Sequence, residues 1–301
     1  MKDTGFPSIP GYEFVRLLGY GCGGAAACSS LYLARKRDCG LLVALKISNQ
    51  RGHDRFPVDV AAVGRLEHPN ILRVIEVGEL EDYWYEALEY VEARTLSDKL
   101  RQGPLPVTVA LALGAALASA LQCARDQGMI HRSPTPRSIV LAEENVPKLH
   151  PADFATSVEN AQKGDHVLGL VGDPAFCPPE YLDGECLEIT PAMDVYRVGA
   201  VLYAMLTGRP PYVGDDAMTV VQQALRAPPV LPRRLNSKVP GGLEAVCMTC
   251  LEKAPQRRYA SVGCLAEALD GSAHAPDPPA HAGEGLRARL MSRVLGGRGS
   301  R

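Results

Sequence analysis

Three features of the sequence could bind a phosphorylated ligand. A glycine pattern, Gly19-x-Gly21-x-x-Gly24, lies between two predicted strands with no helix after it. A glycine-rich hairpin can bring backbone N–H groups close to phosphate oxygens, because no side chain keeps them apart. Lys46 supplies a cation on an apolar predicted strand, and Asp153 supplies a carboxylate further along the chain. Each feature alone is weak evidence, because the glycines also suit a plain hairpin turn and a strand Lys usually faces solvent.

The elements that would position these residues change in character near residue 92. Alternating and β-branched residues predict strands at 12–18, 31–34, 41–47, 71–77 and 84–91, with a short helix at 58–66. Apolar residues at helical spacing predict helices at 96–101, capped by Thr95, and at 107–124, 194–207, 217–225 and 243–251. Strands followed by helices indicate an α+β protein of two packed lobes.

The helix predicted at 107–124 has no charged residue over eighteen positions, which is close to the length that spans a bilayer. It contains Thr108, Ser119 and Gln122, and it lacks basic or aromatic anchors at both ends. These features favour a buried helix over a membrane span.

The bulk composition excludes some classes of function. With 301 residues and a net charge of −2, the chain has no electrostatic footprint for nucleic acid or an anionic membrane. Nine Cys, an odd number, indicate free thiols in a reducing compartment and therefore a cytoplasmic protein. The first residues carry no apolar segment typical of a secretory signal. Cys247-x-x-Cys250 lies on a predicted helix with no second Cys pair nearby, which favours core packing over a metal site.

Further motifs follow in a fixed order along the chain. They are Val43-Ala44-Leu45-Lys46, His68-Pro69-Asn70-Ile71, Leu88-Glu89-Tyr90-Val91, His131-Arg132-Ser133, Asp153-Phe154-Ala155, Pro178-Pro179-Glu180, the segment 194–199 that begins with Asp194, and the segment 250–259 that contains Arg258. Together with the glycine pattern, this order and spacing resemble the protein kinases, most closely the bacterial serine/threonine kinases of eukaryotic type. The resemblance covers residues 12 to 270.

The resemblance implies the bilobal kinase fold, with an N-terminal lead-in at 1–11, a β-rich N-lobe at 12–91, a helical C-lobe at 92–270 and a flexible Arg-rich tail at 271–301. It implies ATP and magnesium as cofactors, with Asp153 as the metal ligand. The nucleotide-binding residues implied are Leu18, Gly19, Gly21, Gly24, Ala44, Lys46, Glu89, Val91, Leu141 and Asp153. The structural residues implied are Asp59, His131, Arg132, Phe154, Glu180, Asp194 and Arg258.

The departures from the kinase pattern concern phosphate transfer. Ser133 replaces the Asp that accepts the substrate hydroxyl proton, and Thr135 replaces a Lys that contacts the transferred phosphate. Ser138 replaces the Asn that holds the second magnesium, Ala155 replaces a Gly, and Asp173 replaces a Thr that faces the catalytic Asp and Lys. Loss of a positioned base alone typically lowers a rate by about 10²–10⁴. The pattern thus predicts a kinase fold without an intact catalytic centre.

Nucleotide binding is a separate question. Lys46 remains, and Asp59 stands where the family places the Glu that pairs with this Lys. The segment from Gly24 to Lys46 is longer than in the family, with residues 25–30 inserted, so closing this loop over phosphates costs more entropy.

Three hypotheses on function follow from the sequence. The first is a pseudokinase, a signalling or scaffolding module that has a protein partner and possible residual ATP binding. The second is a weakly active or unorthodox serine/threonine kinase, and the third is an interaction module that binds no nucleotide. The five Arg of residues 286–301 suit contact with an acidic surface, although a solvated tail is the simpler interpretation.

Overall fold

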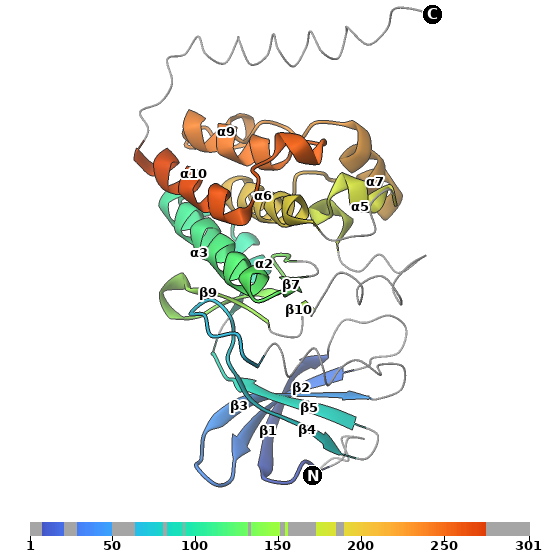
Figure 1. The fold of residues 1–301 in the computed structure, drawn as a ribbon, viewed down its shortest axis with the longest axis vertical. Helices are drawn as coiled ribbons and strands as arrows, with labels where there is room; N and C mark the ends of the chain where they lie inside the picture. Colours follow the sequence, from blue (N-terminus) through green and yellow to red (C-terminus); the bar gives the residue numbers. More distant parts are fainter. Residues whose placement is uncertain are drawn as a thin grey trace, which may run out of the picture.

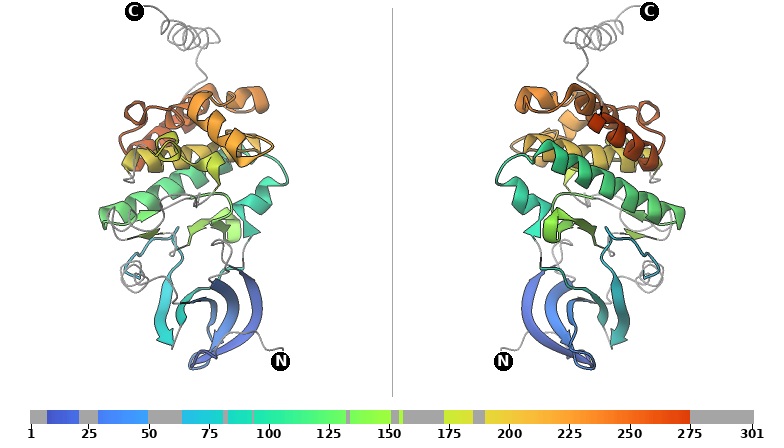
Figure 2. Two further views of the ribbon diagram at one scale, coloured as in Figure 1. Left: turned by 90° about the vertical axis from the view of Figure 1, so that its right-hand side faces the viewer. Right: turned by 90° about the vertical axis from the view of Figure 1, so that its left-hand side faces the viewer.

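The computed structural model describes residues 8–20, 29–49, 64–80, 83–92, 94–131, 134–150, 154–155, 173–184 and 190–274. These residues form two lobes, with a β-sheet in the lower half of Figure 1 and a layered group of helices in the upper half. The two side views in Figure 2 show the same separation, with the sheet curved away from the helices. The arrangement agrees with the predicted α+β class.

The smaller lobe is one antiparallel sheet with the strand order β1-β2-β3-β5-β4. Its strands are β1 (Tyr12–Tyr20), β2 (Ser29–Lys36), β3 (Leu42–Asn49), β4 (Val74–Leu80) and β5 (Tyr83–Glu89). Each predicted strand overlaps one of them. The strand predicted at 71–77 was placed three residues too early, because Ile71 instead bridges to Leu149 of the other lobe.

Side chains of this sheet alternate between two faces, as the pleat of a strand requires. One face is apolar and packs into a core of its own, formed by Ile9, Tyr12, Tyr32, Ala34, Val43, Leu45, Ile47 and Ala87. The intervening residues of β3 and β5, among them Ala44, Lys46, Glu86 and Leu88, therefore share the opposite face. This second face is the one that meets the helical lobe.

The larger lobe contains helices of very different length. They are α2 (Leu96–Leu100), α3 (Val107–Asp126), α5 (Pro179–Leu182), α6 (Pro191–Thr207), α7 (Ala217–Arg226), α8 (Pro232–Leu235), α9 (Gly241–Cys250) and α10 (Val262–His274). The predicted cap of α2 is confirmed, because the Thr95 hydroxyl accepts a hydrogen bond from the Asp98 N–H at 3.1 Å and the Asp98 carboxylate accepts one from the Thr95 N–H at 3.1 Å.

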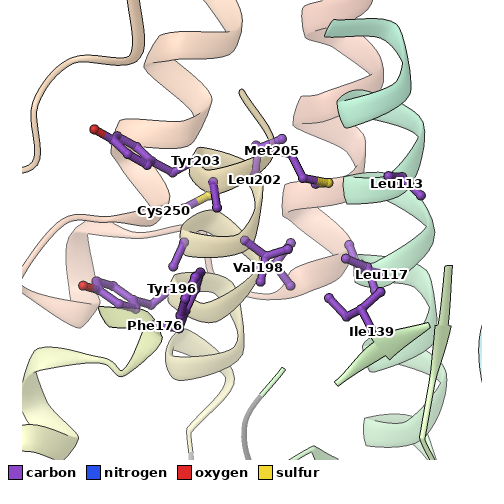
Figure 3. Close-up of a cluster of buried hydrophobic side chains, with 14 of the residues drawn as sticks. Leu113, Leu117, Ile139, Phe176, Tyr196, Val198, Leu202, Tyr203, Met205 and Cys250 are labelled. Carbon is purple, nitrogen blue, oxygen red and sulfur yellow. The ribbon is translucent and has the colours of Figure 1, made fainter. Parts of the chain in front are cut away.

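The long helices α3 and α6 form the centre of this lobe. Helix α3 buries Ala110, Leu113, Leu117 and Leu121 and packs against α6 and α10. Among the described helices it is the one long and apolar enough to cross a membrane by length and composition. Here its apolar side is part of the helical core, in agreement with the prediction of a buried helix. Figure 3 shows Leu113 and Leu117 of α3 facing the α6 side chains.

Helix α6 is buried along nearly its whole length, including every residue from 193 to 206. Its Gly199 lies against Cys250 of α9, so closely that a Cβ at position 199 would overlap the Cβ of Cys250. Cys247 and Cys250 are both fully buried in this core, which agrees with the prediction that the pair packs in the core.

Short strands connect the two lobes. β6 (Arg94–Thr95), β8 (Ile139–Leu141) and β9 (Pro147–Leu149) form one small sheet, and β7 (Ile130–His131) pairs with β10 (Phe154–Ala155). Single turns of 3₁₀ helix lie at Glu143–Asn145 (η1), Pro174–Phe176 (η3) and Pro255–Arg257 (η4). None of these elements was predicted, because two or three residues are too few to show a periodicity.

The C-terminal boundary of the lobe differs from the prediction. Helix α10 was not predicted, and it continues to His274, four residues into the segment assigned to a flexible tail at 271–301. The rest of that tail lies outside the described residues, as does most of the helix predicted at 58–66.

Candidate functional site

A cavity of about 870 Å³ lies between the two lobes. The sheet contributes Leu18, Leu31, Ala44 and Leu88, and β8 contributes Val140 and Leu141 from the other side. The segment that joins the lobes, residues 89–92, closes one edge. The cavity is thus a slot with apolar walls and a polar connecting segment, which is the usual composition of a small-molecule site.

The structure brings together five of the predicted nucleotide-binding residues in the lining of this cavity. They are Leu18, Ala44, Glu89, Val91 and Leu141. Gly19 pairs with Leu31 in the β1–β2 ladder, and open space surrounds the position that a Cβ would take. Gly21, Gly24 and Asp153 lie outside the described residues.

Sequence reasoning missed several lining residues, including Leu31, Val140 and His150. The alternation of β2 marked Leu31 only as a strand residue, because alternation does not tell which face meets the other lobe. Val140 belongs to a three-residue strand, and His150 follows a strand of the same length. Only the tertiary packing places them in the slot.

The segment that joins the lobes is tied to both of them. The Glu89 carboxylate forms an ion pair with the Lys148 ammonium of β9. The Glu89 N–H donates to the carbonyl of Arg73 at 2.9 Å, and Arg16 of β1 donates to the Tyr90 hydroxyl at 3.4 Å. These contacts fix the edge of the cavity relative to both the sheet and β9.

Lys46 lies two residue pairs beyond the cavity-lining pair Ala44 and Leu88 along the β3–β5 ladder, and therefore on the same face of the sheet. Its cross-strand partner is Glu86, whose side chain is almost fully buried. Burial raises the pKa of Glu86, and the nearby charge of Lys46 opposes that rise. Burial lowers the pKa of His150 to about 3, with a further contribution from Lys46, so His150 is neutral at pH 7.

His131 and Phe154 lie in the short β7–β10 pair at the edge of the helical lobe that faces the sheet (Figure 1). The two residues are paired between β7 and β10, and their rings meet edge to face with centroids 4.7 Å apart. The His131 carbonyl accepts a hydrogen bond from Nη1 of Arg197 at 3.3 Å. Arg132 and Ser133, which follow His131 directly, lie outside the described residues.

Thr135 and Ser138 close a turn with one another. The Thr135 N–H donates to Oγ of Ser138 at 3.0 Å, and the Ser138 hydroxyl and N–H donate to the Thr135 carbonyl at 3.1 and 3.0 Å. Thr135 is buried. The hydroxyl of Ser138, at the position where the family has a metal-binding Asn, therefore takes part in the hydrogen bonds of its own turn.

Asp173 also has a local structural role. It is the N-cap of η3, and its Oδ1 accepts a hydrogen bond from the Ala175 N–H at 3.0 Å. Asp is among the residues that cap a helical N-terminus best. The carboxylate at this position thus stabilises the start of η3.

Glu180 and Arg258 form a bidentate ion pair, with N–O distances of 2.6 and 2.7 Å. The Arg258 side chain is fully buried, lies over the ring of Tyr196 and donates further hydrogen bonds to three backbone carbonyls. This ion pair, between two residues for which the resemblance implied a structural role, joins α5 to the segment after α9. Such a planar, multiply bonded guanidinium is a structural connection rather than a reactive group.

Asp194 of α6 is bound by two arginines. Arg125 of α3 donates to its Oδ2, and Arg197 lies 3.6 Å from its Oδ1. Burial raises the pKa of Asp194, and the two guanidinium groups oppose that rise. The resemblance implied a structural role for Asp194, and these contacts are structural. Among the described residues, the group of this cluster that contacts the segment at His131 is Arg197, through the His131 carbonyl.

The described part of the site fits the base of a nucleotide better than its phosphates. A planar purine suits the apolar slot between Ala44, Leu88 and Leu141. Lys46 supplies a cation deeper in the cleft, whereas Asp59 and Asp153 lie outside the described residues. Within the described ranges, no cluster of three His, Cys, Asp or Glu could hold a metal ion.

Comparison with known proteins supports the same assignment. The family model of the protein kinase domain matches residues 12–269. A probable serine/threonine-protein kinase of Clostridium perfringens is 34% identical over 245 residues, which are 79% of this chain and 35% of the relative. Serine/threonine-protein kinase PknB of Mycolicibacterium smegmatis is 32% identical over 262 residues, covering 82% of this chain and 40% of the relative. The chain therefore spans well under half the length of these two curated relatives.

Proposed function

The chain belongs to the protein kinase domain family, and on that premise we propose that it is a pseudokinase, a kinase-fold signalling or scaffolding module that binds ATP weakly. The proposal starts from its serine/threonine kinase-like domain. Because the relatives are much longer, the activity and partners of the whole protein belong to the proposal as well.

The observation that carries the proposal is the joint replacement of residues that transfer phosphate in the family. Ser133 has no carboxylate to accept a substrate proton, and its hydroxyl is not basic near neutral pH. Ser138 and Asp173 have taken up local structural hydrogen bonds, in the turn with Thr135 and at the start of η3. These changes act in one direction, toward slower transfer.

Weak nucleotide binding is supported by the cavity and by Lys46. The cavity of about 870 Å³ is large enough for a nucleotide, and its apolar walls suit the base. When bound, magnesium ATP would supply the phosphate groups that Lys46 and Asp153 contact in the family. The longer segment between Gly24 and Lys46 is the reason to propose weak rather than tight binding.

We further propose a cytoplasmic location and a protein partner. Free thiols support the first, and the six cysteines of the described ranges are indeed not disulfide-bonded. The Arg-rich residues 286–301 offer a segment for contact with an acidic surface, which is a proposal from sequence alone.

The experiment that tests this function has two measurements. Thermal-shift titration with ATP, with and without magnesium, is expected to raise the unfolding midpoint of the wild type but not that of a Lys46→Met variant. A ligand at about 100 times its dissociation constant adds about 2.7 kcal/mol of stability. Radiolabelled transfer from ATP to the protein itself or to a generic substrate is expected to be absent or slow. Transfer at roughly 1–100 s⁻¹, the usual kinase range, would refute the pseudokinase.

A weakly active serine/threonine kinase is the second candidate. It is favoured by the relatives, which are named as serine/threonine kinases. The edge-to-face contact between His131 of β7 and Phe154 of β10 favours it as well. Slow transfer that disappears in the Lys46→Met variant supports this candidate. No thermal shift with ATP under either condition would instead support an interaction module that binds no nucleotide.

A further inference from the structure

Glu86 is a carboxylate in an unusual place. It lies in the middle of β5, with 1% of its surface exposed, and neither carboxylate oxygen has a hydrogen-bond partner. A buried carboxylate without a partner is strongly unfavourable, so a native protein normally supplies a cation or hydrogen-bond donors. The question is therefore which neighbouring group can act as the cation or donor for the Glu86 carboxylate.

The sheet register identifies one candidate. Lys46 of β3 is directly opposite Glu86, and Val77 of β4 is opposite on the other side. Beyond Lys46, the same row continues through Leu31 of β2 to Gly19 of β1. Lys46 and Glu86 are thus the only charged residues of a row that crosses five strands, and they are neighbours. Side chains directly opposite in an antiparallel pair have Cβ atoms about 4.5–5.5 Å apart.

Few other charged groups among the described residues lie near this row. Within that part of the chain, Lys46 is the one charged group that acts on the titration of Glu86, and His150 lies near Lys46 as a neutral imidazole. The acidic and basic residues Glu76 and Lys36 bond to each other on the opposite face of the sheet, with Tyr12 and Tyr85. They are separated from Glu86 by the sheet itself.

We infer that Glu86 is the counter-ion of Lys46 and holds the Lys46 ammonium at the back of the cleft, two residue pairs behind the cavity-lining pair Ala44 and Leu88. The kinase pattern instead assigns this role to a carboxylate at Asp59. Glu86 comes from the same rigid sheet as Lys46, so this pairing needs no movement of another element. It makes Glu86 a positioning residue for Lys46, the cation that β3 places on the face of the sheet that meets the helical lobe.

The test is a set of unfolding midpoints measured on the full chain without nucleotide. Lys46→Met leaves Glu86 buried without a cation and is expected to lower the midpoint by about 5 °C or more. Adding Glu86→Leu to that variant removes the unpaired carboxylate and is expected to restore most of the loss. The matched control adds Glu13→Leu, which changes an exposed glutamate of β1 and is expected to restore nothing.

If the unfolding midpoint of Lys46→Met recovers only when Glu86→Leu is added, the result supports the pairing of Lys46 with Glu86. Additive effects of Lys46→Met and Glu86→Leu overturn it, and so does recovery by Asp59→Leu in place of Glu86→Leu. If Lys46→Met cannot be purified folded, folded protein from the double variant counts as recovery, and failure of both overturns the inference. None of these outcomes depends on ATP binding.

A second measurement, of ligand affinity, tests whether Glu86 positions Lys46 or has a purely structural role. This measurement rests on the proposed ATP binding. Glu86→Gln removes the competing anion, so the affinity for ATP is expected to rise about fivefold while that for adenosine, which has no phosphate, stays the same. An equal change for both ligands would leave Glu86 with a structural role only and overturn the positioning of Lys46. A chain that binds neither ligand contradicts the proposed function, while the midpoints above still decide the pairing.

Discussion

Arg125 of α3 donates two hydrogen bonds to the Asp194 carboxylate of α6, from Nε at 3.0 Å and from Nη2 at 2.5 Å. Asp194 is fully buried, and Arg197 of the same helix lies 3.6 Å from its second oxygen. Arg197 in turn donates to the His131 carbonyl. A chain of charge-assisted contacts thus connects the two central helices, α3 and α6, to His131 of β7.

We expect Asp194→Ala to lower the free energy of unfolding by about 3–5 kcal/mol, because it leaves two guanidinium groups in the core without their anion. Urea denaturation measures this change. The matched control is Asp126→Ala, at the exposed residue next to Arg125, which is expected to stay within about 0.5 kcal/mol of the wild type. A similar loss for both variants would show that Arg125 and Arg197 do not depend on Asp194.

His150, half-buried in the wall of the cavity, gives the protein a stability that depends on pH. Its pKa in the folded protein is about 3, below the usual 6.5, so the unfolded chain binds this proton more readily. The stabilising contribution is complete above pH 6.5 and is lost as the pH falls from 6.5 toward 3. At pH 5 the expected loss is about 1–2 kcal/mol relative to pH 7.5.

Urea midpoints of the wild type and of His150→Gln at pH 7.5 and pH 5 measure this effect. The wild type is expected to lose more stability than the variant, because glutamine does not titrate. Other ionisable groups contribute as well, and the raised pKa of Glu86 acts in the opposite direction. Their effects cancel in the comparison of the two proteins. Equal losses in both would contradict a neutral His150.

Two glycines in the long helices should respond oppositely to alanine. Gly199→Ala places a Cβ where the Cβ of Cys250 lies, and we expect it to cost about 1–3 kcal/mol through overpacking. Gly114→Ala of α3 brings its Cβ to 3.4 Å from Leu269, an ordinary contact. That change is expected to be neutral or to stabilise by about 0.5–1 kcal/mol, since alanine favours a helix. Stabilisation by both variants, measured in urea, would contradict the close α6–α9 contact.

Much of the fold could be predicted from the sequence because its longer elements have a clear period. The strands of the small lobe and the helices α3, α6, α7 and α9 each present a repeating apolar pattern. Helix α10 was missed because Gly263, Gly271 and Ser272 interrupt its apolar residues. The tail was consequently predicted to begin inside that helix. The family was recognised from the order of motifs, which holds even where single motifs have changed.

The site was predicted less completely, because the residues that the prediction missed reach the site only through tertiary packing. Glu86 is preceded by Trp84 and Tyr85 in a strand where a polar residue would ordinarily face solvent. Only the register of β3 with β5 shows that it faces Lys46. Likewise, no local signal showed that Asp173 caps η3 or that Arg197 contacts the His131 carbonyl.

The turn formed by Thr135 and Ser138 indicates how phosphate transfer could be restored. An asparagine at position 138 has both a donor and an acceptor, so it can replace the Ser138 hydroxyl in its two bonds to the Thr135 backbone. A threonine at position 173 keeps an oxygen that can cap η3. The family residues at these two positions are therefore compatible with the present local structure.

We expect the combined variant Ser133→Asp, Thr135→Lys, Ser138→Asn and Asp173→Thr to raise the rate of radiolabelled phosphate transfer from ATP by about 100-fold or more. A positioned base alone is worth about 10²–10⁴, and the other changes return the phosphate and metal contacts that act with it. Ser133→Asp alone is expected to give a smaller rise, because groups that act as a unit are not additive. The control is the combined variant with Lys46→Met, which should return to the background. No rise in a folded combined variant that binds ATP would show that the defect lies elsewhere, in the glycine segment or at Asp153.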